Sequence, residues 1–299
     1  MLFDTLLERW CALADGARIV LVTDDGQHDI ACRVARQTEH PCTVCLYDAS
    51  DALRSALMAL KPCDLVLVLQ GFDSYLSMPR WFSAMGKPAW LAAKCAFIRL
   101  GIRHDSLVEG LATPKEAVYA KISERGALPP EKLLRITNAA GTELTLRTGP
   151  FATCAHEITA DGGFCFLPPS ETSSEVIPGS ANGRIVVDVT VGQLRVFAQE
   201  LAYFGLVPSP VTVEVRNGVL ADVYGNAMAD EFKARIFALP EDARTLVELG
   251  QGLSAMQPTG LIGVDESIID TCHFGFGHHE NGTHTDLVIR CPTIQVAED

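Results

Sequence analysis

Histidines and glycines are concentrated near the end of the chain, in residues 272–286. This stretch contains four of the eight histidines of the sequence, His273, His278, His279 and His284, and it closes with His284-Thr285-Asp286. Imidazole and carboxylate groups are the ligands that borderline or hard divalent metal ions take, and the intervening glycines allow the backbone to bend tightly. The pattern therefore predicts one half of a metal site.

His284 and Asp286 could share a metal ion because residues 283–289 have the pattern of a strand. Residues two apart on a strand point to the same face, with Cα atoms roughly 7 Å apart. The alternative is an ordinary polar strand face, since His-x-Asp is short and unspecific. His273 lies upstream, across a glycine-rich bend that can fold one segment back on the other. His278 and His279 are adjacent, so at most one of them faces such a site, and an exposed loop pair is the alternative.

Two glutamates elsewhere are candidates for the remaining ligands. Glu248 ends residues 242–249, whose pattern predicts a helix, just before Gly250-Gln251-Gly252. Glu171 follows Pro168-Pro169-Ser170. Most glutamates are solvated surface acids, so spacing alone leaves both roles open.

The composition excludes several classes of function. The 24 basic and 37 acidic residues give a net charge of -13, and a protein this acidic repels the phosphate backbone of nucleic acid. No apolar run reaches the length that spans a membrane, and the N-terminus has acids where a signal peptide would be positive, so we expect a cytoplasmic protein. Of the ten cysteines, Cys42 and Cys45 have redox or zinc spacing, but their neighbours predict a strand and a structural role.

The first part of the chain alternates continuous apolar strands with helical segments. We expect strands at 18–23, 43–47 and 64–69, and helices at 28–36 and 51–60. This alternation predicts an α/β fold with a doubly wound parallel sheet covered on both faces. The glycine pattern of a dinucleotide site does not follow the first strand.

A Gly-Ala-Leu-Pro-Pro segment at 126–130 marks the expected boundary between an N-terminal α/β domain, residues 1–130, and a strand-rich α+β metal-binding domain, residues 131–299. In the second domain we expect a hairpin over 134–147, strands at 184–189 and 211–215, and a helix at 229–237. Asn217-Gly218 is a hairpin turn signal.

With these residues identified, the chain resembles the thermophilic metallo-aminopeptidase family (aminopeptidase T-like), whose wider superfamily also includes 2,5-dihydroxypyridine 5,6-dioxygenase. The resemblance covers most of residues 134–290 and rests on four segments in the family's order: Gly141-Thr142-Glu143-Leu144-Thr145, Pro168-Pro169-Ser170-Glu171 leading to Asn182-Gly183, Glu248-Leu249-Gly250-Gln251-Gly252, and His273 with His284-Thr285-Asp286.

The resemblance implies that Glu171, Glu248, His273, His284 and Asp286 ligate metal, with Glu171 and Glu248 also as candidate catalytic carboxylates. It implies two divalent ions, zinc, cobalt or manganese, a small-molecule or short-peptide substrate, and a homodimer. Such a ligand set can lower the pKa of a bound water and polarise a carbonyl.

Three hypotheses remain open. The first is a hydrolase of an amide or peptide bond. The second is a mononuclear Fe(II) ring-cleaving dioxygenase acting on a dihydroxylated aromatic compound, with His273, His284 and Asp286 as its triad. The third is a binding protein with a degenerate site. The family's aminopeptidases carry a Tyr after the first His, where this chain has Glu280, and His278 or His279 is the alternative replacement.

Overall fold

The computed structural model describes residues 2–71, 77–84, 93–98, 101–153, 163–196, 199–278 and 282–297. By its contacts the chain divides into two compact units, Met1–Thr113 with Cys154–Ser170, and Pro114–Thr153 with Glu171–Asp299. The division therefore falls just before helix α6 (Lys115–Gly126) rather than near residue 130, and the chain returns once to the first unit.

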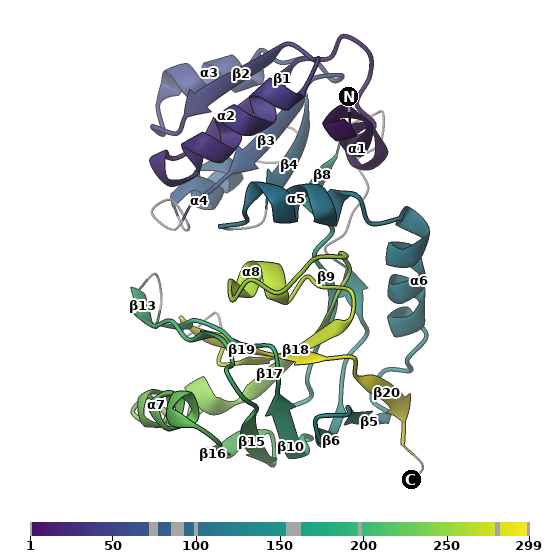
Figure 1. Ribbon diagram of the computed structural model, residues 1–299, viewed down its shortest axis with the longest axis vertical. Coiled ribbons are helices and arrows are strands. Elements are labelled where there is room, and N and C mark those ends of the chain that lie inside the picture. The colour runs from purple at the N-terminus through teal and green to yellow at the C-terminus, as the bar shows by residue number, and fades with distance from the viewer. Residues whose placement is uncertain are drawn as a thin grey trace. The chain divides into compact units, whose positions relative to one another are not determined.

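The first unit is built around a parallel sheet of five strands in the order β2-β1-β3-β4-β8. The strands are β1 (Ile19–Thr23), β2 (Cys42–Leu46), β3 (Leu65–Leu69), β4 (Lys94–Ile98) and β8 (Phe164–Leu167). The helices are α1 (Leu2–Cys11), α2 (His28–Gln37), α3 (Asp51–Met58), α4 (Ser77–Ala84) and α5 (His104–Leu111). The predicted α/β fold with a parallel sheet is confirmed (Figure 1).

Apolar side chains explain why this sheet is covered. All five residues of β3 are buried, as expected for a central parallel strand with a core on each face. Leu53 and Leu57 of α3 and Trp81 and Phe82 of α4 pack in one core cluster with alternate strand residues such as Val66. Helices α1, α2 and α5 contact one another, and α2 also contacts β1 and β2.

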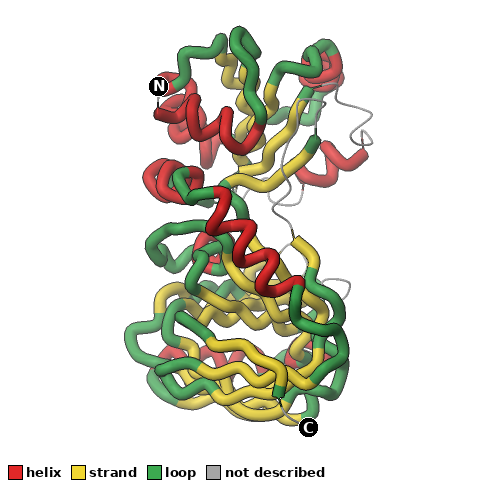
Figure 2. The backbone as a smooth tube through the Cα atoms, turned by 90° about the vertical axis from the view of Figure 1, so that its right-hand side faces the viewer, coloured by secondary structure: helices red, strands yellow, loops and turns green. Residues whose placement is uncertain are grey.

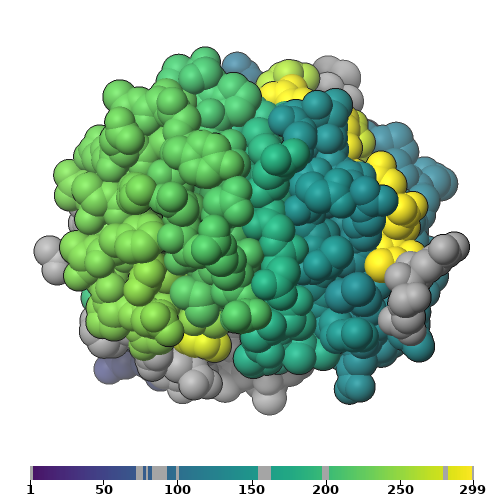
Figure 3. Space-filling model, turned by 90° about the horizontal axis from the view of Figure 1, so that it is seen from below, coloured from purple at the N-terminus to yellow at the C-terminus, as the bar shows by residue number. Residues whose placement is uncertain are grey.

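The second unit consists mainly of strands, as the yellow segments of Figure 2 show. One sheet has six strands in the order β16-β15-β10-β6-β5-β20. These are β5 (Leu133–Thr137), β6 (Glu143–Arg147), β10 (Asn182–Val187), β15 (Val211–Arg216), β16 (Val219–Tyr224) and β20 (Thr293–Val296). The space-filling view from below follows the same order, from green through teal to the yellow C-terminal strand (Figure 3).

The other sheet has nine strands, seven of them in the order β13-β12-β19-β18-β17-β9-β7; β11 pairs with β19, and β14 pairs with β11. These are β7 (Ala152–Thr153), β9 (Glu171–Glu175), β11 (Thr190–Val191), β12 (Leu194–Val196), β13 (Gln199–Ala202), β14 (Gly205–Leu206), β17 (Leu246–Gly252), β18 (Thr271–Phe276) and β19 (Thr283–Arg290). Helices α7 (Ala227–Ile236) and α8 (Ile262–Asp265) complete the unit.

One buried cluster joins the two sheets of this unit to α7. It contains Leu144 and Val213 of the six-stranded sheet, Leu249 and Phe274 of the nine-stranded sheet, and Phe232 of α7. Since this cluster occupies one face of β17, β18 and β19, the polar residues that alternate with it lie on the opposite face. The core therefore fixes which side of the nine-stranded sheet carries the predicted metal ligands.

Local signals explain several boundaries. The side chain of Asn226 caps α7 by accepting from the backbone N–H groups of Met228 and Ala229. Asn217 and Gly218 both have positive φ, 49° and 79°, as the predicted Asn-Gly hairpin between β15 and β16 requires.

The helix predicted over 242–249 is wrong. Residues 241–244 form a short 3-10 turn, and Glu248 lies within β17. The strand is hydrogen-bonded on both sides, to β9 and to β18. Pairing with these distant strands outweighs the weak helical pattern of the local sequence, which glycines at 250 and 252 also limit.

Candidate metal centre

The five predicted ligands come from four strands of the nine-stranded sheet: Glu171 from β9, Glu248 from β17, His273 from β18, and His284 with Asp286 from β19. These strands are neighbours in the order β9-β17-β18-β19. The predicted strand over 283–289 is confirmed as β19, and it forms an antiparallel pair with β18 as the glycine-rich bend indicated. The sheet thus brings together residues that are up to 115 positions apart, from 171 to 286.

The antiparallel register sets the ligands beside glycines. Glu248 is paired with Gly275, which is paired on its other side with Asp286. Gly250 is paired with His273, and Gly252 with Glu171. Directly paired residues have side chains on the same face, so ligands and glycines share one surface.

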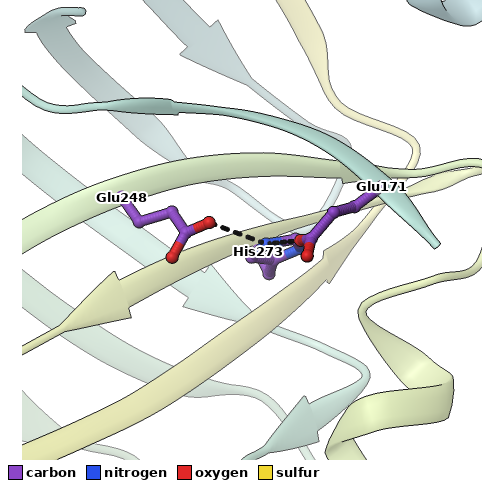
Figure 4. A group of neighbouring side chains, drawn as sticks. All are labelled: Glu171, Glu248 and His273. Atoms are coloured by element: carbon purple, nitrogen blue, oxygen red, sulfur yellow. Dashed lines mark ion pairs between the residues drawn. The ribbon is translucent and has the colours of Figure 1, made fainter. Parts of the chain in front are cut away.

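The first group consists of Glu171, Glu248 and His273. The Nε2 atom of His273 lies 2.8 Å from Oε2 of Glu171 and 4.0 Å from Oε1 of Glu248. Figure 4 shows the imidazole between the two carboxylates. The His273 side chain is only 2% exposed, whereas those of Glu171 and Glu248 are partly open to solvent. Ligand atoms of all three residues lie within 4.8 Å of one another.

The second group consists of Glu248, His284 and Asp286. The Nε2 atom of His284 lies 3.1 Å from Oδ1 of Asp286 and 4.0 Å from Oε2 of Glu248. On the other side of the ring, Nδ1 of His284 lies 3.1 Å from the carbonyl oxygen of Gly277. A carbonyl oxygen only accepts, so Nδ1 carries the proton and Nε2 is the atom directed at the carboxylates.

Glu248 belongs to both groups. Its Oε1 atom faces His273 and its Oε2 atom faces His284. A single carboxylate therefore spans the two groups with one oxygen directed to each. Within the described part of the chain, no group of this kind contains both His273 and His284.

The local charges favour cations in both positions. Burial lowers the pKa of His273, but the adjacent Glu171 and Glu248 carboxylates outweigh it and raise that pKa well above its ordinary value. Burial likewise lowers the pKa of His284, but the charge of Asp286 prevails and raises it to about 9. Burial raises the pKa of Glu248, yet the hydrogen bond and charge of His273 bring it below its usual value. The carboxylates thus retain protons on both imidazoles, in positions that a divalent cation could take over.

Two glycines make room for the ligand side chains. A Cβ atom at position 250 would collide with the imidazole of His273. At position 275 it would lie 2.9 Å from Cβ of Glu248, 2.9 Å from Cε1 of His284 and 3.1 Å from Oδ1 of Asp286. The two groups of ligand side chains therefore depend on residues without a side chain at positions 250 and 275. In the sequence this requirement is visible only as the glycines themselves.

The ligand types and their surroundings fit a metal. Imidazole nitrogens and carboxylate oxygens converge from four strands, and such mixed sets suit zinc, cobalt and manganese. Nδ1 of His273 is buried and has no hydrogen-bond partner among the described residues. The site therefore has the composition and charge of a metal centre.

Several polar residues outside the two groups have varied positions. His278 is exposed, and His279, Glu280 and His156 lie outside the described residues. The Tyr203 hydroxyl donates to the carbonyl oxygen of Gly260. Arg195, in β12, is paired with His284.

Sequence reasoning did not identify Glu266, which follows α8. Its negative charge helps to raise the pKa of His273, after the larger effects of burial, Glu171 and Glu248. No spacing signal indicated it, because Glu266 lies at the end of α8, outside the strands that carry the five predicted ligands.

The comparisons with known proteins show a distant structural relationship. No protein-family model and no curated protein matches the chain. Among solved structures, 2,5-dihydroxypyridine dioxygenase from Pseudomonas putida KT2440 is similar with a TM-score of 0.65 and 15% identity, covering 99% of this chain and 92% of the other. AmpT from Thermus thermophilus is similar with a TM-score of 0.53 and 15% identity, covering 98% of this chain and 94% of the other. At this identity the likeness establishes the two-unit α/β fold over nearly the whole chain.

None of the helices in the described residues is long and apolar enough to cross a membrane.

Proposed function

We propose that this protein is a metal-dependent hydrolase that cleaves an amide or peptide bond in a small molecule or short peptide. The observation that carries the proposal is the position of Glu248, whose two oxygens face two separate groups of ligand side chains. A single-ion site has no need of a carboxylate divided in this way, whereas a pair of ions a few ångströms apart could be bridged by one.

Glu171, Glu248 and His273 would hold one ion, and Glu248, His284 and Asp286 the other. Two zinc, cobalt or manganese ions would supply an activated water and a polarised substrate carbonyl. The similarity to AmpT and the resemblance to aminopeptidase T-like proteins agree with this assignment.

The chain's own residues provide orientation and proton transfer. Nδ1–H of His284, bonded to the carbonyl of Gly277, keeps Nε2 as the ligand atom. The Glu171 carboxylate, which is partly open to solvent, is the proposed base that accepts a proton from the attacking water, because both oxygens of Glu248 are directed at the two ligand groups. Since all five side chains lie on paired strands, their geometry is fixed before a substrate binds.

The second candidate is a mononuclear Fe(II) ring-cleaving dioxygenase. Its support is the similarity to 2,5-dihydroxypyridine dioxygenase, which has the higher TM-score of the two structures. Its expected triad of His273, His284 and Asp286 is not one of the two groups found in the described residues. For this reason the hydrolase is preferred.

The experiment is metal analysis joined to activity. Protein purified without a histidine tag or chelator is analysed for metal per chain, then assayed for release of amino acids from short peptides and for oxygen uptake with 2,5-dihydroxypyridine after loading with Fe(II). We expect about two zinc, cobalt or manganese ions per chain and peptide hydrolysis. One iron per chain with oxygen uptake would establish the dioxygenase instead, and absence of tightly bound metal would indicate a binding protein.

A matched pair of variants tests the shared carboxylate. Glu248→Gln should lose metal from both positions and lose hydrolysis. Glu175→Gln is the control. Glu175 lies in β9 and is paired with Glu248 of β17, but its side chain is exposed and belongs to neither group of candidate ligands. Hydrolysis retained in Glu248→Gln would refute the mechanism. The homodimer expected from the resemblance remains a prediction, to be checked by light scattering of the same preparation.

A further inference from the structure

A guanidinium group lies one strand beyond the metal centre. Arg195 in β12 is paired with His284 in β19, so the two side chains start from the same face of the sheet. Arg195 is half-buried. It is thus a cationic side chain whose backbone lies in direct register with a proposed ligand.

The neighbouring backbone holds this strand close to the site. The N–H group of Gly192 donates to the carbonyl oxygen of Asp286 at 2.8 Å, and a Cβ atom at position 192 would lie only 2.7 Å from that oxygen. Gln193, which is 5% exposed, accepts a hydrogen bond through Oε1 from Nη2 of Arg195. A buried amide therefore restrains the guanidinium of Arg195.

The charge of the site indicates what this cation recognises. Two divalent ions would exceed the three carboxylates of Glu171, Glu248 and Asp286 by one positive charge, which the charge of Glu266 would offset, and Arg195 then adds one positive charge. The chain as a whole is strongly acidic, with a net charge of -13. A local excess of positive charge on such a protein attracts an anionic group, and the planar fork of a guanidinium matches a carboxylate.

We infer that Arg195 binds a carboxylate of the substrate, so that the hydrolase prefers substrates with a free carboxylate near the scissile bond. This inference rests on the proposed function, because the cleaved bond and the two ions in the charge count belong to that proposal, whereas the pairing of Arg195 with His284 does not. Gln193 is then a positioning residue that restrains the guanidinium.

The test measures binding and catalysis separately on zinc-loaded protein. Benzoate and its uncharged analogue benzamide are titrated by calorimetry into the wild type, Arg195→Gln, Arg195→Lys and the control Arg216→Gln. Arg216 is exposed on β15 of the other sheet. We expect Arg195→Gln to bind benzoate roughly 10- to 100-fold more weakly, with Arg195→Lys in between, and neither benzamide binding nor zinc content to change.

Kinetics use leucylglycine and leucylglycinamide, which differ only in the carboxylate. The wild type should prefer the acid, and Arg195→Gln should lose the preference mainly through a higher KM. Equal benzoate affinity in Arg195→Gln and the wild type would overturn the inference, as would loss of zinc in both Arg195→Gln and Arg195→Lys, which would assign the residue to the metal site.

The two proposals fail in distinguishable ways. If neither dipeptide is cleaved but benzoate binding depends on Arg195, the hydrolase is refuted and the anion site stands. If both dipeptides are cleaved equally and benzoate binding ignores Arg195, the hydrolase stands and the inference is refuted.

Discussion

A methyl group at position 275 should remove the second metal position while leaving the fold intact. In Gly275→Ala the new Cβ would lie 2.9 Å from Cβ of Glu248, 2.9 Å from Cε1 of His284 and 3.1 Å from Oδ1 of Asp286. Carbon atoms in contact prefer separations of about 3.5–4.0 Å, so Glu248 and His284 must move by roughly half an ångström or more and Asp286 by a few tenths. All three belong to one ligand group.

Metal coordination does not tolerate such a shift. Ligand distances hold to about ±0.2 Å, and disturbing the shell that orients ligands costs roughly 10- to 100-fold in affinity. We therefore expect Gly275→Ala to bind one ion per chain at a metal concentration where the wild type binds two, and to bind the remaining ion more weakly than the wild type does, because that ion shares Glu248. The strand itself should persist, because alanine fits a β-strand no worse than glycine does.

Competition with a chromophoric chelator measures the affinities, and elemental analysis after dialysis measures the stoichiometry. The control is Gly126→Ala, since a Cβ at the end of α6 meets no atom within 4 Å. Circular dichroism checks that both variants are folded. Two ions bound by Gly275→Ala with wild-type affinity would refute the reasoning that bare backbone at this position creates the site.

Three further predictions follow from the same structure. Gly250→Ala should weaken metal binding by the group of Glu171, Glu248 and His273, because the new Cβ would collide with the imidazole of His273. Unchanged metal affinities in the same competition assay would contradict this prediction. Removing metal with a chelator should lower the Tm of the wild type but not the Tm of the double variant His284→Ala/Glu171→Ala. An ion that binds only the folded state stabilises it by about 2.7 kcal/mol when the ion concentration is 100 times Kd. Equal Tm shifts in the two proteins would argue against a bound ion. Asp64 accepts from the backbone N–H groups of Arg18 and Lys61 and from the Arg18 guanidinium at 2.6 Å; burial raises its pKa, but these bonds bring it below the ordinary 3.8. A depressed folded-state pKa gives stability that is present above about pH 4 and is lost as the pH falls through the folded-state pKa. Asp64→Asn should therefore lower the free energy of unfolding at neutral pH by about 2 kcal/mol and flatten the decline of this free energy in acid. Urea titrations in which the acid dependence is unchanged would contradict this prediction.

Much of the fold is determined by local pattern. The continuous apolar run of β3 specifies a strand buried on both faces, and its alternation with helical segments specifies a parallel sheet. The Asn217-Gly218 turn and the Asn226 cap are likewise readable, because each depends on the conformation of one or two residues. His284 and Asp286 share a face for the same reason, since strand periodicity alone places residues two apart together.

Tertiary structure decided what local pattern could not. Glu248 seemed to end a helix, yet pairing with β9 and β18 makes it the centre of a strand and of the site. The contact of Glu171 with His273 joins residues 102 positions apart, and the insertion of β8 beside β4 depends on a return of the chain after β7. Sheet order and register are set by burying one face of many strands at once, so they are properties of the packed whole and not of any single segment. The resemblance carried by the sequence named five candidate ligands, and the sheet divides them into two groups around one shared carboxylate.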